Sequence, residues 1–145
     1  MGIESVESPK DLDDNFADLI ISDNALEHTT YPLKELKELY RILKPGGKIV
    51  FVIPCESINR AYRPNDINYH LYSWSPMCAG NLFNEAGFNV IESKAFKHKW
   101  PPKYEKIAKL FGRKIFNLTC KIYARWETSW FQVRVVAEKK TTNNI

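Results

Sequence analysis

His28 and the acidic residue before it are the pair in this sequence best suited to proton transfer. A histidine titrates near neutral pH, so His28 could act as a general base that draws a proton from a hydroxyl or an amine. Glu27 could orient its ring. Adjacent residues on a strand or loop point apart, however, so the two need not cooperate, and a structural or solvated histidine is the alternative interpretation.

A second group of polar and aromatic side chains follows further along the chain. Aromatic rings here could close over a substrate, and the alternative is core packing. The candidate substrate-binding residues are Tyr69, His70, Tyr72 and Trp74. Glu27, His28 and His70 would suit a metal ion on paper, but their spacing matches no metal-ligand motif, so no metal site is expected.

The elements that position these residues begin with a β-α-β unit over residues 16–54. The run Leu19–Ile21 is short, apolar and bounded by polar residues, which is typical of a buried parallel strand. Residues 23–31 form the loop at its carboxyl end. Thr29 or Thr30 can cap the next helix and Pro32 suits its first position. A Gly-Gly turn then leads into a strand over residues 49–53.

The rest of the chain predicts a single α/β domain over residues 1–145. We expect a helix from about Pro76 to residue 86, a strand over 88–93 and a last strand over 129–137. Residues 2–7 alternate weakly and could add a short strand. Between the last two long strands, residues 94–127 predict one or two basic amphipathic helices, which read as an insertion.

Two segments carry a resemblance to a known family. The first is Asp23-Asn-Ala-Leu-Glu-His28, and the second is Leu43-Lys-Pro-Gly-Gly-Lys-Ile-Val-Phe-Val-Ile-Pro54. They resemble the segment after strand four and the helix-to-strand-five signature of class I S-adenosylmethionine-dependent methyltransferases, most closely the type 11 small-molecule group. Residues 83–88 and 129–137 are similar to the approach to strand six and to the last strand.

The resemblance implies a partial Rossmann-like sheet of strands four to seven, with the last strand antiparallel and helices on its faces. It implies methyl transfer from S-adenosylmethionine to a small-molecule or glycan-like acceptor. The loop beside the sulfonium and methionine end of that cofactor would consist of Asp23, Asn24, Ala25 and Leu26. The alternative for this loop is simple helix capping. Acceptor-binding residues would follow strand five.

One departure from the family is large. The family's glycine-rich loop after its first strand has no counterpart among the six glycines here, and the resemblance implies that the chain begins just before the family's third strand. We therefore expect an inactive domain or one that needs a second chain. Strand 16–22 would then be an open edge, covered by residues 2–7, a second copy or a partner chain. The alternative function is a non-catalytic binding or assembly module.

Charge is distributed unevenly along the chain. Residues 1–93 hold 8 Lys and Arg against 14 Asp and Glu, whereas residues 94–126 hold 10 Lys and Arg against Glu105 alone. This density favours an anionic partner at residues 94–126, namely a phosphate-bearing substrate, a nucleic acid or a membrane surface, or else a solvated helix face.

The cysteines and the apolar runs indicate the compartment. Cys55, Cys78 and Cys120 form no metal or disulfide pattern, so we expect reduced, mostly buried thiols in a cytoplasmic protein. No apolar run approaches the ~20 residues of a membrane-spanning helix.

Overall fold

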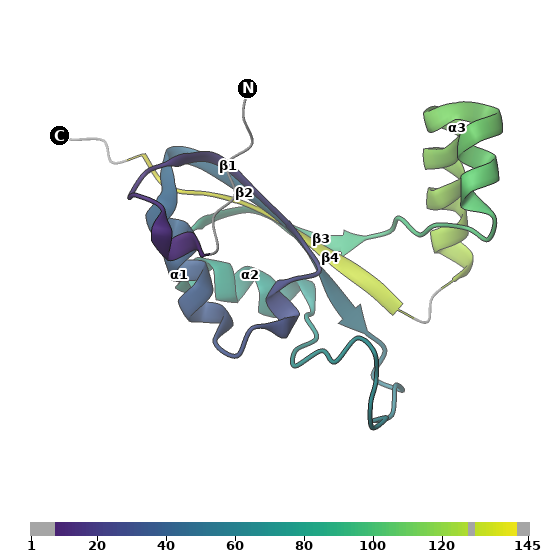
Figure 1. The fold of residues 1–145 in the computed structure, drawn as a ribbon, viewed down its shortest axis with the longest axis horizontal. Coiled ribbons are helices and arrows are strands. Elements are labelled where there is room, and N and C mark those ends of the chain that lie inside the picture. The colour runs from purple at the N-terminus through teal and green to yellow at the C-terminus, as the bar shows by residue number, and fades with distance from the viewer. Residues whose placement is uncertain (1–7, 128–129, 142–145) are drawn as a thin grey trace.

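The fold is a four-stranded sheet flanked by helices (Figure 1). The computed structural model describes residues 8–127 and 130–141. In chain order the elements are η1 (Pro9–Asp11), β1 (Ala17–Asp23), η2 (Leu26–His28), α1 (Pro32–Ile42), β2 (Leu43–Glu56), α2 (Pro76–Glu85), β3 (Asn89–Phe96), α3 (Tyr104–Trp126) and β4 (Trp130–Glu138).

The strand order β1-β2-β4-β3 confirms the sheet expected for strands four to seven. β1 and β2 are parallel, with Ile20 opposite Ile49. β4 lies between β2 and β3 and runs antiparallel to both, with Val135 opposite Phe51. The two parallel strands therefore end on the same side of the sheet, and the loops that follow β1 and β2 meet there.

The core lies between the sheet and the two helices α1 and α2, which cover the same face of it (Figure 1). Alternate residues of the two central strands point into this core because side chains on a strand alternate between faces. Leu36 of α1 and Phe83 of α2 pack on them and are fully buried. The strand residues of this layer are Ile49, Phe51, Ile53, Val133, Val135 and Ala137.

The opposite face of β1 is open in the described part of the chain. Leu19 is 54% exposed and Ile21 is 71% exposed, whereas Ile20 between them packs against the core. The expectation of a buried strand at Leu19–Ile21 is therefore wrong for one face of the strand, whereas the open edge expected for strand 16–22 is found among the described residues. β1 is the edge strand of the sheet, and residues 2–7, which were expected to be able to cover it, lie outside the described residues.

The start of α1 differs from the sequence-based expectation. Pro32 is the first helical residue as predicted, but the N-cap is Tyr31, whose side chain makes no capping hydrogen bond. The hydroxyl of Thr29 instead donates to the carbonyl of Leu26, 3.0 Å away. Thr29 thereby closes the turn of η2 and does not cap the helix that follows.

α3 stands away from the sheet, beyond the ends of β3 and β4 (Figure 1). It consists of two helical segments that meet at Gly112, whose φ of 72° and ψ of 176° are essentially open only to glycine. At its base the Lys99 ammonium donates to the carbonyl of Glu127 at 2.6 Å and lies over the Trp130 ring. Burial lowers the pKa of Lys99. The predicted pair of basic helices is present.

The three cysteines are free, but only Cys120 is fully buried; Cys55 is half-buried and Cys78 is exposed, contrary to the expectation of mostly buried thiols. Within residues 8–127 and 130–141, no helix is both long enough and apolar enough to cross a membrane.

Candidate active site

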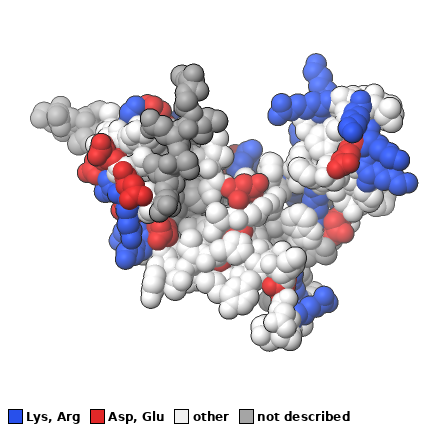
Figure 2. Space-filling view, viewed as in Figure 1, with Lys and Arg blue, Asp and Glu red and all other residues white. Residues whose placement is uncertain are grey.

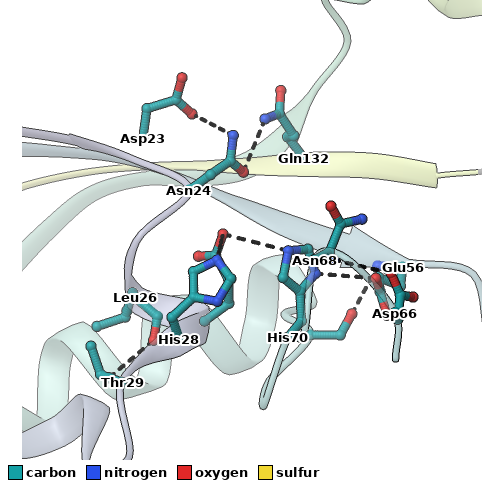
Figure 3. A network of polar contacts seen from close by, with 12 residues as sticks. Asp23, Asn24, Leu26, His28, Thr29, Glu56, Asp66, Asn68, His70 and Gln132 are labelled. Atoms are coloured by element: carbon teal, nitrogen blue, oxygen red, sulfur yellow. Dashed lines mark hydrogen bonds and ion pairs between the residues drawn. The ribbon is translucent and has the colours of Figure 1, made fainter. Parts of the chain in front are cut away.

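A cleft of about 470 Å³ lies where the loops after β1 and β2 meet the beginning of β4. Its lining includes Asn24, His28, Glu56, His70, Trp130 and Gln132. Open α/β sheets bind ligands beyond the carboxyl ends of their parallel strands, and this cleft occupies that position. Figure 3 shows the polar side chains that converge there.

The loop after β1 is fixed by bonds to two other strands. The Asn24 amide N–H donates to the carbonyl of Val52 in β2 at 2.9 Å. The Asn24 side chain accepts from Gln132 of β4 at 3.3 Å and donates to the Asp23 carboxylate at 3.0 Å. Asn24 itself adopts a φ of 49°, in the left-handed region that asparagine tolerates. The loop therefore presents the exposed carboxylate of Asp23 at the end of the strand.

The four residues expected to face the cofactor are not equivalent. Asp23, Asn24 and Ala25 are exposed. The side chain of Leu26 is buried in the core beside α1, so only its backbone could face a ligand.

Glu27 is the unusual residue of this site, because its carboxylate is fully buried and neither oxygen has a hydrogen-bond partner. Its Oε1 lies 3.8 Å from His28 Nε2 and 3.9 Å from His70 Nε2. Adjacent residues were expected to point apart, yet the tight turn of η2 brings Glu27 and His28 to the same point. The two imidazole rings meet edge to face, with centroids 5.1 Å apart.

His70 is held from its other side. Its Nδ1 lies 3.1 Å from Oε1 of Glu56, and Arg60 forms an ion pair with the same oxygen at 3.1 Å. The loop that carries His70 is anchored by the Leu71 N–H, which donates to the carbonyl of Glu27 at 2.9 Å. His70 is therefore an oriented side chain, whereas the side chain of His28 is 45% exposed toward the cleft.

The other expected substrate-binding residues, Tyr69, Tyr72 and Trp74, lie in different surroundings in the structure. Tyr69 is 74% exposed and shares a neighbouring cleft with His70. Tyr72 donates its hydroxyl proton to the carbonyl of Thr30 at 3.0 Å. Trp74 is buried in the core and stacks on Tyr72, with ring centroids 5.4 Å apart. His70 thus joins His28, while Trp74 packs in the protein interior.

Glu56 and Gln132 are site residues that sequence reasoning missed. Glu56 ends β2, and the carboxyl end of a parallel strand is the signal that could have drawn attention to it. Gln132 lies in an antiparallel strand and comes to the site only through its register with Pro54. No sequence pattern marks that register.

The chain is similar in sequence to known methyltransferases. Residues 3–51 match the family described as "Methyltransferase domain". The chain is 34% identical over 61 residues to the ubiquinone/menaquinone biosynthesis C-methyltransferase UbiE of Neisseria gonorrhoeae (strain NCCP11945), a match that covers 42% of this chain. The matched region spans about a quarter of that relative (23%).

Solved structures show the same fold. The [4+2]-cyclase SpnF is similar at a TM-score of 0.59 and 18% identity, over 94% of this chain and 54% of that one. Phosphoethanolamine N-methyltransferase 2 of Haemonchus contortus, in complex with phosphomonomethylethanolamine and S-adenosylhomocysteine, is similar at 0.59 and 15% identity, over 90% and 35%. The resemblance to class I methyltransferases and the partial Rossmann-like fold that it implies are confirmed.

Proposed function

We propose that this chain, which has the sequence signature and fold of the carboxyl-terminal half of a class I methyltransferase domain, supplies the acceptor side of an S-adenosylmethionine-dependent methyl transfer. The observation that carries the proposal is the cleft itself. It brings Asn24 together with His28 and His70 at the carboxyl ends of β1 and β2, and Asp23 lines the adjoining pocket.

The residues present fit one part of the cofactor. S-adenosylmethionine supplies an electrophilic methyl group on a sulfonium cation. The exposed carboxylate of Asp23, which accepts a hydrogen bond from Asn24, favours a positive charge in the adjoining pocket that Asp23 and Asn24 line. The chain contains no G-x-G-x-G segment to cradle the rest of the cofactor. We propose that polypeptide outside residues 1–145 supplies those contacts.

The residues of this chain then act on the acceptor. In the transfer, the bond between carbon and sulfur breaks while a bond forms from the methyl carbon to an acceptor oxygen or nitrogen. A single-domain enzyme achieves this mainly by aligning the two partners in a dry site. His28, which is open to the cleft, takes the proton released by the acceptor, and His70 lines the cleft beside it.

The open edge of β1 is the surface through which the domain would be completed. Edge strands are generally covered, and Leu19 and Ile21 expose apolar side chains beside an unpaired backbone edge in the described structure. We infer that a polypeptide carrying the glycine-rich first half pairs here. Pairing with a second copy of this chain, in a homodimer without that half, would instead favour a non-catalytic assembly module.

The test is a fusion that restores the missing half. The part of UbiE that precedes the matched 61 residues is joined ahead of residue 8 of this chain. We expect the fusion to bind S-adenosylmethionine with a dissociation constant below about 1 mM, the upper end of ordinary substrate affinities. We expect the unfused chain to bind at least tenfold more weakly. A fusion that melts cooperatively but gives no heat of binding in calorimetry overturns the proposal.

A matched pair of variants separates the role of Asp23 from general charge. In the fusion, Asp23→Asn should weaken binding of the cationic S-adenosylmethionine more than binding of neutral S-adenosylhomocysteine. Asp18→Asn removes the same charge from the other end of β1, where Asp18 pairs with Lys44 at 2.8 Å, and should affect neither. Equal losses in both variants would argue against a contact between Asp23 and the sulfonium.

A second candidate function concerns α3, which we infer to lie on an anionic bilayer. Figure 2 shows Lys and Arg side chains gathered over this element. Large apolar side chains are exposed along the same helices, a combination typical of interfacial helices and unusual in a purely solvated one. They are Leu110, Phe111, Ile115, Leu118, Ile122 and Trp126. A cytoplasmic location, inferred from the three free thiols, would bring α3 to the anionic leaflet.

Sedimentation with phosphatidylserine-containing vesicles tests this function. We expect retention on these vesicles, little retention on pure phosphatidylcholine, and loss on raising the salt concentration. Phe111→Asp should abolish retention, whereas Ile58→Asp, at a residue 98% exposed outside α3, should not. Salt-sensitive binding to single-stranded RNA that survives Phe111→Asp, without vesicle retention, would contradict the bilayer as partner.

A further inference from the structure

We propose that Glu27, His28 and His70 bind a divalent transition-metal ion of the zinc or manganese kind in the cleft. The spacing of these residues along the sequence gave no reason to expect a metal. Within the described residues, however, they form a group whose potential ligand atoms all lie within 4.8 Å of one another. The ion would sit among Glu27 Oε1, one nitrogen of His28 and Nε2 of His70.

The potential ligand atoms lie so close together that a small movement would bring them into contact with one ion. Bonds from zinc to imidazole nitrogen and carboxylate oxygen are about 2.0–2.2 Å long, so two ligands of one ion stand at most about 4.4 Å apart. Glu27 Oε1 lies 3.8 Å from His28 Nε2 and 3.9 Å from His70 Nε2, inside this limit. Both contacts are too long to be hydrogen bonds.

The burial of Glu27 is an independent observation. Its side chain is 0% exposed and both carboxylate oxygens lack a hydrogen-bond partner. A buried carboxylate without hydrogen bonds is strongly disfavoured, and such groups are ordinarily paired or bound to a metal. The carbonyl of Glu27 accepts the Leu71 N–H, so the backbone on both sides of the group is fixed. A cation between the carboxylate and the two rings satisfies the orphaned oxygen.

His70 also has the support that metal-ligating histidines show. Such a histidine almost always donates its second ring N–H to a carboxylate or carbonyl, which fixes the tautomer and directs the free nitrogen at the metal. Glu56 Oε1 lies 3.1 Å from His70 Nδ1 and is itself held by Arg60. A proton on Nδ1, shared with this carboxylate, would leave the Nε2 lone pair facing Glu27 and free to bind a metal ion.

The ligand set selects the class of ion. Two imidazoles and one carboxylate suit zinc, manganese or ferrous iron, whereas magnesium and calcium prefer oxygen ligands and water. Three protein ligands leave coordination positions open, as in catalytic sites. His28 and His70 both line the cleft, so the open positions face the volume assigned above to the acceptor. A metal there would bind and acidify an acceptor hydroxyl and so replace His28 as the proton acceptor, because the His28 nitrogen would then be a ligand. That role rests on the proposed function, whereas metal binding itself does not.

Zinc and cobalt titrations of the unfused chain test the site without any cofactor. We expect one tightly bound Zn²⁺ per chain in competition with a chromophoric chelator. Co²⁺ should give the visible bands of a nitrogen and oxygen site, without the thiolate charge-transfer band that binding by Cys55, Cys78 or Cys120 would produce. His28→Ala and His70→Ala should each weaken binding at least tenfold. His98→Ala changes the remaining histidine, which lies against Phe96 and Phe116 at the base of α3, and should leave the affinity unchanged.

A conservative variant keeps the test informative if Glu27 variants fail to fold. Glu56→Gln retains the shape of the residue that supports His70 and should lower zinc affinity about 10-fold or more, the usual effect of losing such a supporting group. Zinc that binds equally well to the His28→Ala/His70→Ala double variant, or fails to bind the folded wild-type chain at all, overturns the proposal. Either outcome would leave the test of S-adenosylmethionine binding by the fusion unaffected.

Discussion

His70 Nδ1 lies 3.1 Å from Glu56 Oε1, and this contact directs the other ring nitrogen, Nε2, toward the buried carboxylate of Glu27, 3.9 Å away. Glu56 ends one parallel strand, and Glu27 follows the other. His70 therefore links the loops that follow β1 and β2. This link, the open edge of β1 and the core between the sheet and its helices each have consequences that can be measured.

Zinc should stabilise the chain through Glu27. A ligand that binds only the folded state at about 100 times its dissociation constant adds about 2.7 kcal/mol to the free energy of unfolding. For a chain of this size that corresponds to a rise of several degrees in the melting temperature, measured by differential scanning fluorimetry with and without Zn²⁺. Glu27→Gln should abolish the rise, because an amide is a poor ligand. A rise of the same size in Glu27→Gln would show that zinc binds elsewhere.

The apolar edge of β1 should drive association. We predict that Leu19→Lys/Ile21→Lys leaves the free energy of unfolding within about 0.5 kcal/mol of wild type, since both side chains are exposed. Charges on an edge strand oppose pairing with another strand, so the double variant should be monomeric by light scattering at concentrations where the wild-type chain self-associates. The lysine pair should also prevent association with a separately added first half. A wild-type chain that remains monomeric, alone and with that half, would contradict this use of the edge.

Phe83 should be the side chain of α2 on which stability depends most. It is fully buried against Phe51 and Phe88, with ring centroids 5.3 and 5.8 Å away. Phe83→Ala should cost about 3–5 kcal/mol of unfolding free energy, because the removed ring leaves a cavity. Met77→Ala on the same helix, at a residue 73% exposed, should cost less than about 0.5 kcal/mol. Urea denaturation followed by circular dichroism measures both values, and similar losses would mean that α2 does not pack as described.

Glu92 should give the link between β3 and β4 a dependence on pH. Hydrogen bonds from Lys94 and Arg134 hold the pKa of Glu92 below its ordinary value of 4.5. A carboxyl whose pKa is depressed in the folded state stabilises the fold above the unfolded pKa, and that contribution is lost as the pH falls through the folded pKa. Wild type should therefore melt above Glu92→Gln at pH 7, and the gap should close in acid below about pH 4. A gap that is constant from neutral to acid pH would exclude this linkage.

Much of the fold follows from the sequence because its strands are strongly patterned. The run from Ile49 to Ile53 predicts a strand buried in the centre of a sheet, and this strand is found within β2. The Gly-Gly turn was expected to end the preceding helix, but α1 already ends at Ile42 and both glycines lie inside β2. Leu19 and Ile21 look equally apolar in the sequence but are exposed. The sequence pattern shows that both faces of the strand are apolar, but it does not show whether other elements cover both faces.

The site was harder to predict because it depends on how short segments turn. Glu27 and His28 converge through one tight turn, and His70 arrives from a loop fixed by a hydrogen bond to the backbone of Glu27. Trp74 was expected to bind substrate, but its ring is buried in the core. The periodicity of the sequence predicts neither the position of His70 nor the burial of Trp74, because contacts between residues far apart in the chain determine both.

The most direct test of the central claim is an NMR titration of the UbiE fusion, labelled at the histidine rings, with S-adenosylhomocysteine. His28 and His70 line the cleft beside Asn24, and His98 lines the adjoining pocket with Asp23. We predict that the ring resonances of His28 and His70 shift as the ligand saturates. Saturable binding that leaves His28 and His70 unmoved would contradict this prediction, because the cofactor would then occupy some other part of the molecule.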